Sequence, residues 1–197
     1  MSQPGEQKIV FFDEFAVYDR PSLFYAWAEK NSRPEIPSNE RCRNKVNGLL
    51  AVDVKTGKEY LRLTSRAKSE DIANYFLSLV WECIQQGKTE ILIILDNNST
   101  HKKKMKNLLA GLLNKAKISE KIKVLFLHTP PYSPDFNLVE YIIHQLRLKV
   151  LHHQPEGMNI KEVENKLKNY LQFNQLQTPC QINKTIYHIC SLVTSMK

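Results

Sequence analysis

The sequence has few cysteines, and none of them is arranged to bind a metal ion. Cys42, Cys83, Cys180 and Cys190 form no C-x-x-C pair and show no metal-ligand spacing. Cys83 and Cys190 lie in apolar patterns, where we expect a free thiol to pack as a small hydrophobic group. This usage argues against a disulfide framework and indicates a reducing compartment.

Long hydrophobic runs are also missing. The N-terminal stretch MSQPGEQK contains no apolar signal segment, and no run approaches the roughly eighteen residues that a membrane span needs. We therefore expect a soluble, cytoplasmic protein with no membrane partner. If the protein is bacterial, we expect it to be associated with the nucleoid. Internal repeats and low-complexity tracts are absent. No P-loop, G-x-G-x-x-G or S-x-x-K pattern occurs, so nucleoside-triphosphate and acyl-transfer chemistry have no support.

The chain does have the size of one domain and an excess of positive charge. A domain of 197 residues can bury most of its apolar surface without disulfides. The 28 Lys and Arg against 20 Asp and Glu give a net charge of +8. This charge favours an anionic partner such as nucleic acid, although many basic proteins bind none.

Hydrophobic periodicity predicts three strands, then strands alternating with helices. The glycine of Lys55-Thr56-Gly57 predicts a hairpin turn, and Ser69 is the expected N-cap of the first helix. The tail after Pro179 fits a helix or a strand. Expected strands cover residues 8–18, 46–54, 58–63, 90–95 and 123–127, and expected helices cover residues 69–87, 101–117, 138–151 and 160–173. This order predicts an α/β protein with a ribonuclease H-like fold, in which a mixed five-stranded sheet is flanked by helices.

Three acidic residues fall at the ends of expected elements. Asp13 interrupts the first strand, Asp96 follows the apolar run ILIIL, and Glu140 begins a helix after a proline-rich turn. If the first and fourth strands are neighbours, Asp13 and Asp96 face each other, and such carboxylates repel unless a cation lies between them. Mg²⁺ and Mn²⁺ prefer oxygen ligands. The pattern thus predicts a site for divalent metal, with two ions about 4 Å apart able to support displacement at phosphorus.

Other acidic residues have simpler interpretations. Glu14 should face the opposite side of the strand from Asp13, in a structural role or supporting the site. Asp135 is interpreted as a turn residue and Asp53 as a charge near the hairpin turn. The lysines at the start of the second helix oppose the helix dipole, so they indicate either a nearby anion or a solvated face.

Three segments together resemble a known family. FFDEF, LDNNSTH and PPYSPDFNLVE are similar to the signature of DDE transposases of the mariner-like superfamily, especially its bacterial insertion-sequence branch. The resemblance implies that Asp13, Asp96 and Glu140 are both the catalytic acids and the ligands of Mg²⁺ or Mn²⁺. It also implies cleavage of DNA at transposon ends and joining to a target containing TA, with self-association in the DNA complex.

The match departs from the family pattern in two ways. Leu138 stands where proline is usual, and the tryptophan usual near Ile143 or Ile142 is replaced by aliphatic residues. Both changes concern local packing. Family members also carry an N-terminal helix-turn-helix region, whereas we expect residues 1–197 to form the DDE catalytic domain alone. A separately encoded or fused DNA-binding part is therefore a hypothesis.

Nucleic-acid contacts are expected beside the acids, mostly to phosphate. The candidate residues are His101, Lys102, Lys103, Lys104, Tyr132, Ser133, Asn137 and Arg147, with Lys149 as a further candidate. Two other functions remain open: a catalytically silent DNA-binding remnant or regulator of a transposase, and a ribonuclease H-type nuclease.

Overall fold

The computed structural model describes residues 7–19, 29–32, 44–131, 133–152, 154 and 157–195. Tyr132 and Cys42 lie outside these residues, as does most of the segment between the first two strands.

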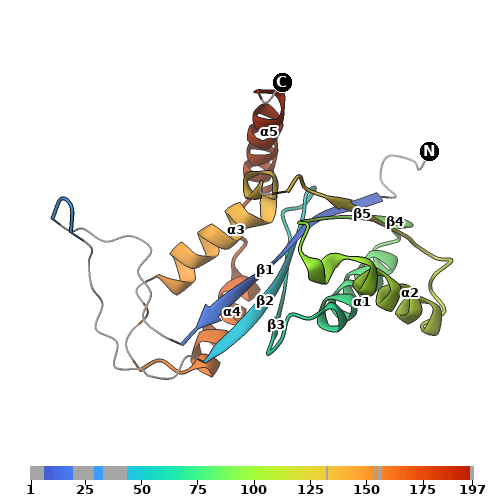
Figure 1. Ribbon diagram of the computed structural model, residues 1–197, viewed down its shortest axis with the longest axis horizontal. Helices are drawn as coiled ribbons and strands as arrows, with labels where there is room; N and C mark the ends of the chain where they lie inside the picture. Colours follow the sequence, from blue (N-terminus) through green and yellow to red (C-terminus); the bar gives the residue numbers. More distant parts are fainter. Residues whose placement is uncertain are drawn as a thin grey trace.

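A mixed five-stranded sheet forms the centre of the fold (Figure 1). Its strand order is β3-β2-β1-β4-β5. The central strand β1 is antiparallel to β2 and parallel to β4, and β4 is parallel to β5. The strands are β1 (Gln7–Tyr18), β2 (Lys45–Asp53), β3 (Glu59–Thr64), β4 (Glu90–Leu95) and β5 (Lys123–His128). The predicted sheet, and the predicted proximity of the first and fourth strands, are thus confirmed.

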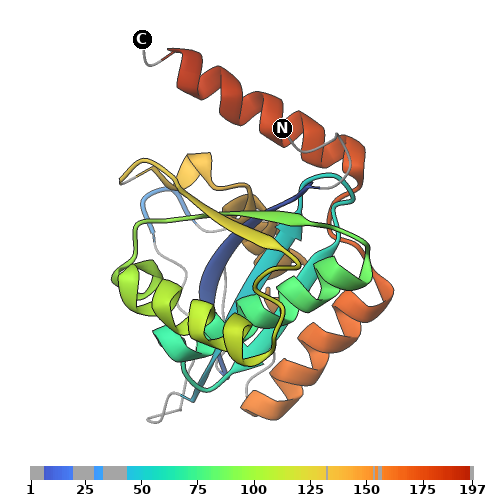
Figure 2. The same ribbon diagram turned by 90° about the vertical axis from the view of Figure 1, so that its right-hand side faces the viewer.

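Helices cover both faces of the sheet, as Figures 1 and 2 show. One face packs against α1 (Ser69–Gln85) and α2 (Lys103–Lys115), and the other against α3 (Leu138–Leu146) and α4 (Ile160–Phe173). The ambiguous tail forms a helix, α5 (Pro179–Ser195), which extends away from the sheet. Within the described ranges, no helix combines the length and the apolar character that crossing a membrane requires.

Strand β1 contributes alternate residues to two separate cores. Val10 and Phe12 pack with α1 and α2, whereas Phe11 and Phe15 pack with α3 and α4. Successive side chains of a strand point to opposite faces, so Asp13 lies on the α3 side. Glu14 lies on the α1 and α2 side, as predicted.

Two glycines allow close packing around the hairpin. Gly57 has φ of +70°, in the left-handed region that favours glycine, and forms the predicted turn between β2 and β3. Gly48 lies opposite Phe15 in the ladder, and a Cβ there would come within 2.4 Å of that ring. The absence of a side chain at Gly48 therefore makes room for Phe15.

Some local predictions were wrong. The N-cap of α1 is Lys68 rather than Ser69, because Asp71 accepts a hydrogen bond from the Lys68 backbone N–H at 3.0 Å. Cys83 is buried as expected, but Cys190 is exposed. The helix expected to run through residue 151 is α-helical only to Leu146, and it continues as a π-helical turn, η3 (Arg147–Leu151).

Candidate active site

Asp13 is a buried carboxylate near the middle of the central strand. It is 9% exposed. Its Oδ1 accepts a hydrogen bond from the Glu14 backbone N–H at 2.8 Å, and its Oδ2 accepts one from the Asn137 side-chain amide at 3.0 Å. Both oxygens are thereby held in place, and each retains a lone pair for a further partner.

Asp96 is aligned with Asp13 by the pairing of their strands. The last paired residues of β1 and β4 are Phe11 and Ile94, and each acid follows two positions later. Asp96 is more open, with 44% of its side chain exposed. Its Oδ1 accepts hydrogen bonds from the Asn98 backbone N–H at 3.0 Å and from Nδ1 of His101 at 2.6 Å.

Glu140 is placed by the proline-rich loop and the cap that follows it. A short helical turn, η2 (Pro134–Phe136), leads into Asn137, which is the N-cap of α3. The Asn137 side chain accepts from the Val139 N–H at 3.2 Å, and its carbonyl accepts from the Glu140 N–H at 3.0 Å. Glu140 therefore lies in the first turn of α3, on the same side as Asp13.

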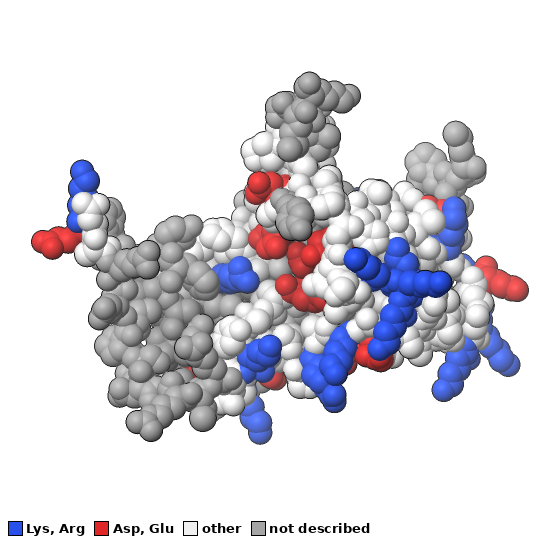
Figure 3. Space-filling view, in the orientation of Figure 1, with Lys and Arg blue, Asp and Glu red and all other residues white. Residues whose placement is uncertain are grey.

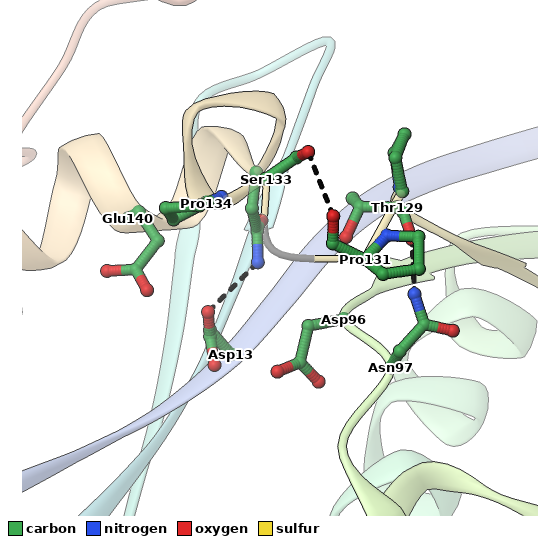
Figure 4. A pocket seen from close by; sticks show the side chains of 10 residues that line it. Asp13, Asp96, Asn97, Thr129, Pro131, Ser133, Pro134 and Glu140 are labelled. Carbon is green, nitrogen blue, oxygen red and sulfur yellow. Dashed lines mark hydrogen bonds between the residues drawn. The ribbon is translucent and has the colours of Figure 1, made fainter.

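The three carboxylates line one cavity of about 400 Å³. Figure 4 shows their side chains projecting into it from three different elements. The face in Figure 3 shows acidic side chains gathered at this place, with lysines and arginines to either side. The cavity lining consists of Asp13, Asp96, Asn97, Thr129, Pro130, Pro131, Ser133, Pro134, Asn137 and Glu140.

The surroundings shift the pKa values of Asp13 and Asp96 in opposite directions. Burial, reinforced by the nearby charges of Glu140 and Asp96, raises the pKa of Asp13 to about 8. For Asp96, burial acts in the same direction, but hydrogen bonds from His101 and the Asn98 N–H lower its pKa overall. The site therefore contains one carboxylate that favours the ionised form and one whose ionisation needs a cation nearby.

His101 is a buried link between two acidic residues. It is 0% exposed, in the short turn η1 (Ser99–His101), and its Nε2 lies 2.8 Å from Oε2 of Glu14. Burial alone would lower the pKa of His101, but the hydrogen bonds that its ring donates to Asp96 and Glu14 raise it to about 10. Its ring has no exposed surface, and the contact of His101 with DNA stays a prediction. The contact of DNA with Asn137, which is 1% exposed and lines the cavity, likewise stays a prediction.

Sequence reasoning missed the part played by His128. Its Nδ1 lies 2.9 Å from the carbonyl oxygen of Asp96, and its Nε2 lies 3.0 Å from Nζ of Lys106. The ring thus fixes the backbone where β4 ends. A signal was present, because the apolar run KVLFLH ends in this histidine on the strand beside β4.

The remaining predicted residues surround the site unequally. Lys102, Lys103 and Lys104 are exposed at the start of α2, and Lys104 pairs with Glu70 at 2.6 Å. Ser133 lines the cavity, and its Oγ donates to the Pro131 carbonyl at 3.2 Å. Arg147 is half-buried in η3 and Lys149 is exposed, with its Nζ 3.4 Å from the Leu176 carbonyl.

Asp53 lies beside the hairpin turn, as predicted, where its Oδ1 accepts from the Lys55 N–H at 2.8 Å, and it also forms a buried ion pair. It is 6% exposed and lies 3.3 Å from Nζ of Lys8, which is 4% exposed. Tyr60 and Gln86 provide two further oxygen partners for the Lys8 ammonium at 2.5 and 3.0 Å. Asp135 is exposed in η2, consistent with a turn residue.

Carboxylate oxygens are suitable ligands for a divalent metal ion, but the three side chains do not lie close together. Among the residues that the structure describes, no three His, Cys, Asp or Glu side chains lie close enough to hold a metal ion. The shared cavity, the lone pairs that remain on each acid and the raised pKa of Asp13 are the features that match a cation.

Fold and site together define an α/β protein with a ribonuclease H-like sheet. Its central strand, the end of the parallel strand beside it and the start of a helix each bring one carboxylate to a shared cavity. The sequence model for the DDE superfamily endonuclease matches residues 8–161. The chain therefore belongs to the DDE superfamily endonuclease family. No curated protein sequence matches it significantly.

Solved structures with the same fold include DNA transposition complexes. In the mariner Mos1 paired-end complex with Mg, the similar chain has a TM-score of 0.67 and 16% identity, with 95% of this chain and 55% of that chain covered. For the Mos1 strand transfer complex the TM-score is 0.59 at 14% identity, covering 92% and 54%. A simian T-cell lymphotropic virus intasome, in complex with the PP2A regulatory subunit B56 gamma, gives 0.52 at 15% identity, covering 88% and 53%. The chain thus spans about half the length of these proteins, and the ribonuclease H-like fold is confirmed.

Proposed function

We propose that this chain is the catalytic domain of a transposase, which cleaves DNA at transposon ends and transfers the strand to a target. The observation that carries the proposal is the meeting of Asp13, Asp96 and Glu140 around one cavity. They come from a strand, a strand end and a helix start that are far apart in the sequence. Membership of a DDE endonuclease family supports the same role for these acids.

Asp13, Asp96 and Glu140 are proposed to hold Mg²⁺ or Mn²⁺, as two ions. The Mos1 paired-end complexes are described with Mg and with Mn. When bound, such ions activate a water or a 3′-hydroxyl and stabilise the leaving oxygen at phosphorus. The chain itself keeps Asp96 ionised through His101 and holds Asp13 against Asn137. Its buried first carboxylate gains stability from a cation, since burial otherwise favours the protonated form.

DNA is the proposed substrate and partner. Lys102 and Lys103 are exposed directly after η1, and their side chains make no hydrogen bond or ion pair with other described residues. Such cations can neutralise phosphates of a bound strand. Ser133 and Arg147, together with Tyr132 from outside the described residues, are proposed as further contacts.

Several finer features belong to the same proposal. They are membership of the bacterial insertion-sequence branch, a target containing TA, and self-association in the DNA complex. The Mos1 chains are nearly twice as long as this one, which supports a further DNA-binding part, separately encoded or fused.

The proposal is tested by substituting Asp96→Ala and measuring nicking of supercoiled plasmid and of transposon-end DNA with Mn²⁺ or Mg²⁺. We expect cleavage to be abolished while the circular dichroism spectrum stays unchanged. Asp135→Ala is the matched control, because this exposed acid lies in the neighbouring turn and outside the cavity lining. Cleavage by the Asp96 variant at the wild-type rate would disprove the metal role.

The fold also supports a ribonuclease H-type nuclease, since the same carboxylates suit hydrolysis of an RNA–DNA hybrid. Comparing cleavage of a hybrid with cleavage of duplex DNA separates these functions. If the wild-type chain nicks neither substrate with Mn²⁺, a catalytically silent DNA-binding remnant becomes the better description.

A further inference from the structure

Strand β1 sends two adjacent carboxylates to opposite faces of the sheet. Asp13 reaches the cavity, whereas Glu14 points to the α1 and α2 side and is only half-buried. Glu14 does not line the cavity. Its Oε2 lies 2.8 Å from Nε2 of His101. The other ring nitrogen, Nδ1, lies 2.6 Å from Oδ1 of Asp96, so Glu14 is connected to the cavity through one imidazole ring.

The ring of His101 has little freedom to move. It has no exposed surface, and it packs edge-on against Phe12 with ring centroids 5.6 Å apart. Its backbone is held as well, because the His101 N–H donates to the Asn98 carbonyl at 3.0 Å. Because the ring is held at both nitrogens and packed against Phe12, it defines the position of the groups that it binds.

Its partner Asp96 would otherwise be free to rotate. This carboxylate is 44% exposed and follows the end of β4. Both of its hydrogen bonds with other described residues, from His101 and from the Asn98 N–H, go to Oδ1. That arrangement fixes the side-chain torsions and leaves Oδ2 to the cavity. Ionised carboxylates only accept hydrogen bonds. One ring N–H therefore donates to Oε2 of Glu14 and the other to Oδ1 of Asp96.

We propose that Glu14 and His101 are positioning residues for Asp96, with Glu14 fixing the ring and the ring fixing Oδ1. This inference rests on the proposed function, since it concerns how the second acid meets a cation. Carboxylate–histidine pairs behind a ligand orient it, and their loss typically weakens metal binding by about 10–100-fold. Strand β1 then supplies Asp13 directly and orients Asp96 through Glu14 and His101.

The inference is tested by Mn²⁺ affinity, measured by isothermal titration calorimetry on the full chain without DNA. Glu14→Gln keeps the size of the side chain but removes its charge, and we expect roughly tenfold weaker Mn²⁺ binding. Glu82→Gln is the matched control, because this α1 acid pairs with Lys58 at 2.8 Å, away from the cavity lining. It should bind Mn²⁺ like the wild type. Equal affinity of the Glu14 variant and the control would overturn the inference.

A double-mutant cycle shows whether Glu14 acts through the ring. In a His101→Gln background, Glu14→Gln should cause little further loss of Mn²⁺ affinity, because the connection is already broken. Fully additive losses would mean that Glu14 acts independently, and would overturn the positioning role. If the His101 variant does not fold, ¹⁵N spectra of the single Glu14 variant replace it. The Nε2 resonance of His101 should then shift far more than Nδ1, and unchanged ring resonances would also overturn the inference.

Asp13→Asn separates this inference from the proposed function. If the Asp13 variant loses Mn²⁺ binding while Glu14→Gln binds normally, the proposed metal site is supported and only the positioning role is refuted. If the wild-type chain binds no Mn²⁺, or the Asp13 variant binds it equally well, the metal site and the positioning role both fail.

Discussion

The side-chain amide of Asn137 donates a hydrogen bond to Oδ2 of Asp13 at 3.0 Å, and so joins residues 124 positions apart in the sequence. The same amide donates to the Phe12 carbonyl at 3.2 Å, while its oxygen caps α3. One buried side chain therefore connects the first acid to the helix that carries the third.

Asn137→Ala should destabilise the fold more than loss of an ordinary helix cap. The variant loses the cap and leaves the Asp13 carboxylate and the Phe12 carbonyl short of a donor. We expect a cost of about 2–4 kcal/mol in the free energy of unfolding, measured by urea denaturation. Asn159→Ala is the control, because Asn159 caps α4 by accepting from the Glu162 N–H at 3.1 Å. It should cost about 1 kcal/mol, and equal costs would contradict the bridging role of Asn137.

Without metal, stability should fall as pH rises from about 4 to about 8. The pKa of Asp13 is raised from 3.8 to about 8, first by burial and then by Glu140 and Asp96. In this range the folded chain retains a proton that the unfolded chain releases, so the free energy of unfolding decreases with pH. Asp13→Asn removes this contribution and should flatten the profile. Urea denaturation in EDTA at pH 5 and pH 8 tests this, and parallel profiles for the two proteins would refute it.

Mg²⁺ should correspondingly raise the melting temperature of the wild-type chain more at pH 8 than at pH 5. At the lower pH the cation must displace the proton from Asp13, which reduces its net stabilisation. The Asp13→Asn variant is the control and should respond weakly at both values. A larger effect of Mg²⁺ at pH 5 would contradict the assignment of Asp13 as a ligand.

The lysines at the start of α2 should control how strongly salt weakens DNA binding. Replacing Lys102 and Lys103 by alanine removes two possible phosphate contacts. The slope of log affinity against log salt should become shallower by about two, as measured by fluorescence anisotropy. Lys168→Ala is the control, since Lys168 lies on α4 within 3.7 Å of Glu164. An unchanged slope in the double variant would show that DNA does not pass over this end of α2.

Two glycines should respond oppositely to alanine. At Gly57, with φ of +70°, an added Cβ would lie 2.5 Å from Nε2 of Gln175 and 2.8 Å from the Gln177 carbonyl. We expect Gly57→Ala to destabilise the chain by about 1–3 kcal/mol. Gly111 in α2 has nothing within 4 Å of such an atom, so Gly111→Ala should stabilise by about 0.5–1 kcal/mol. Thermal unfolding of both variants measures the difference, and a stabilised Gly57 variant would contradict the strained turn.

The sheet and the placement of the three acids could be predicted because their signals are local. A strand that ends in Asp96, and a proline-rich turn before Glu140, are visible within a few residues. The tail from Pro179 could not be assigned, because its apolar pattern fits both periods and its packing against α3 decides the outcome. Nothing local marks the π-helical turn that ends α3.

Interactions between distant residues were the main limit of the sequence reasoning. His101 directly precedes a lysine-rich segment and looks like a surface residue, but Glu14, 87 positions away, accepts a hydrogen bond from its ring in the interior. Likewise, Lys8 is buried only because Asp53, Tyr60 and Gln86 bring oxygen atoms from three elements to its ammonium group. Such roles depend on the assembled fold, because each partner alone gives no sign of them.

The alternation along β1 makes strand alignment a determinant of chemistry as well as of stability. Asp13 pairs with Leu50 and Glu14 with Leu49 on the neighbouring strand. Displacing β1 by one residue would exchange the faces of these two acids and invert both cores at once. An insertion or deletion within this strand should therefore never yield a folded but slow enzyme. Loss of activity and loss of structure at this position are one event.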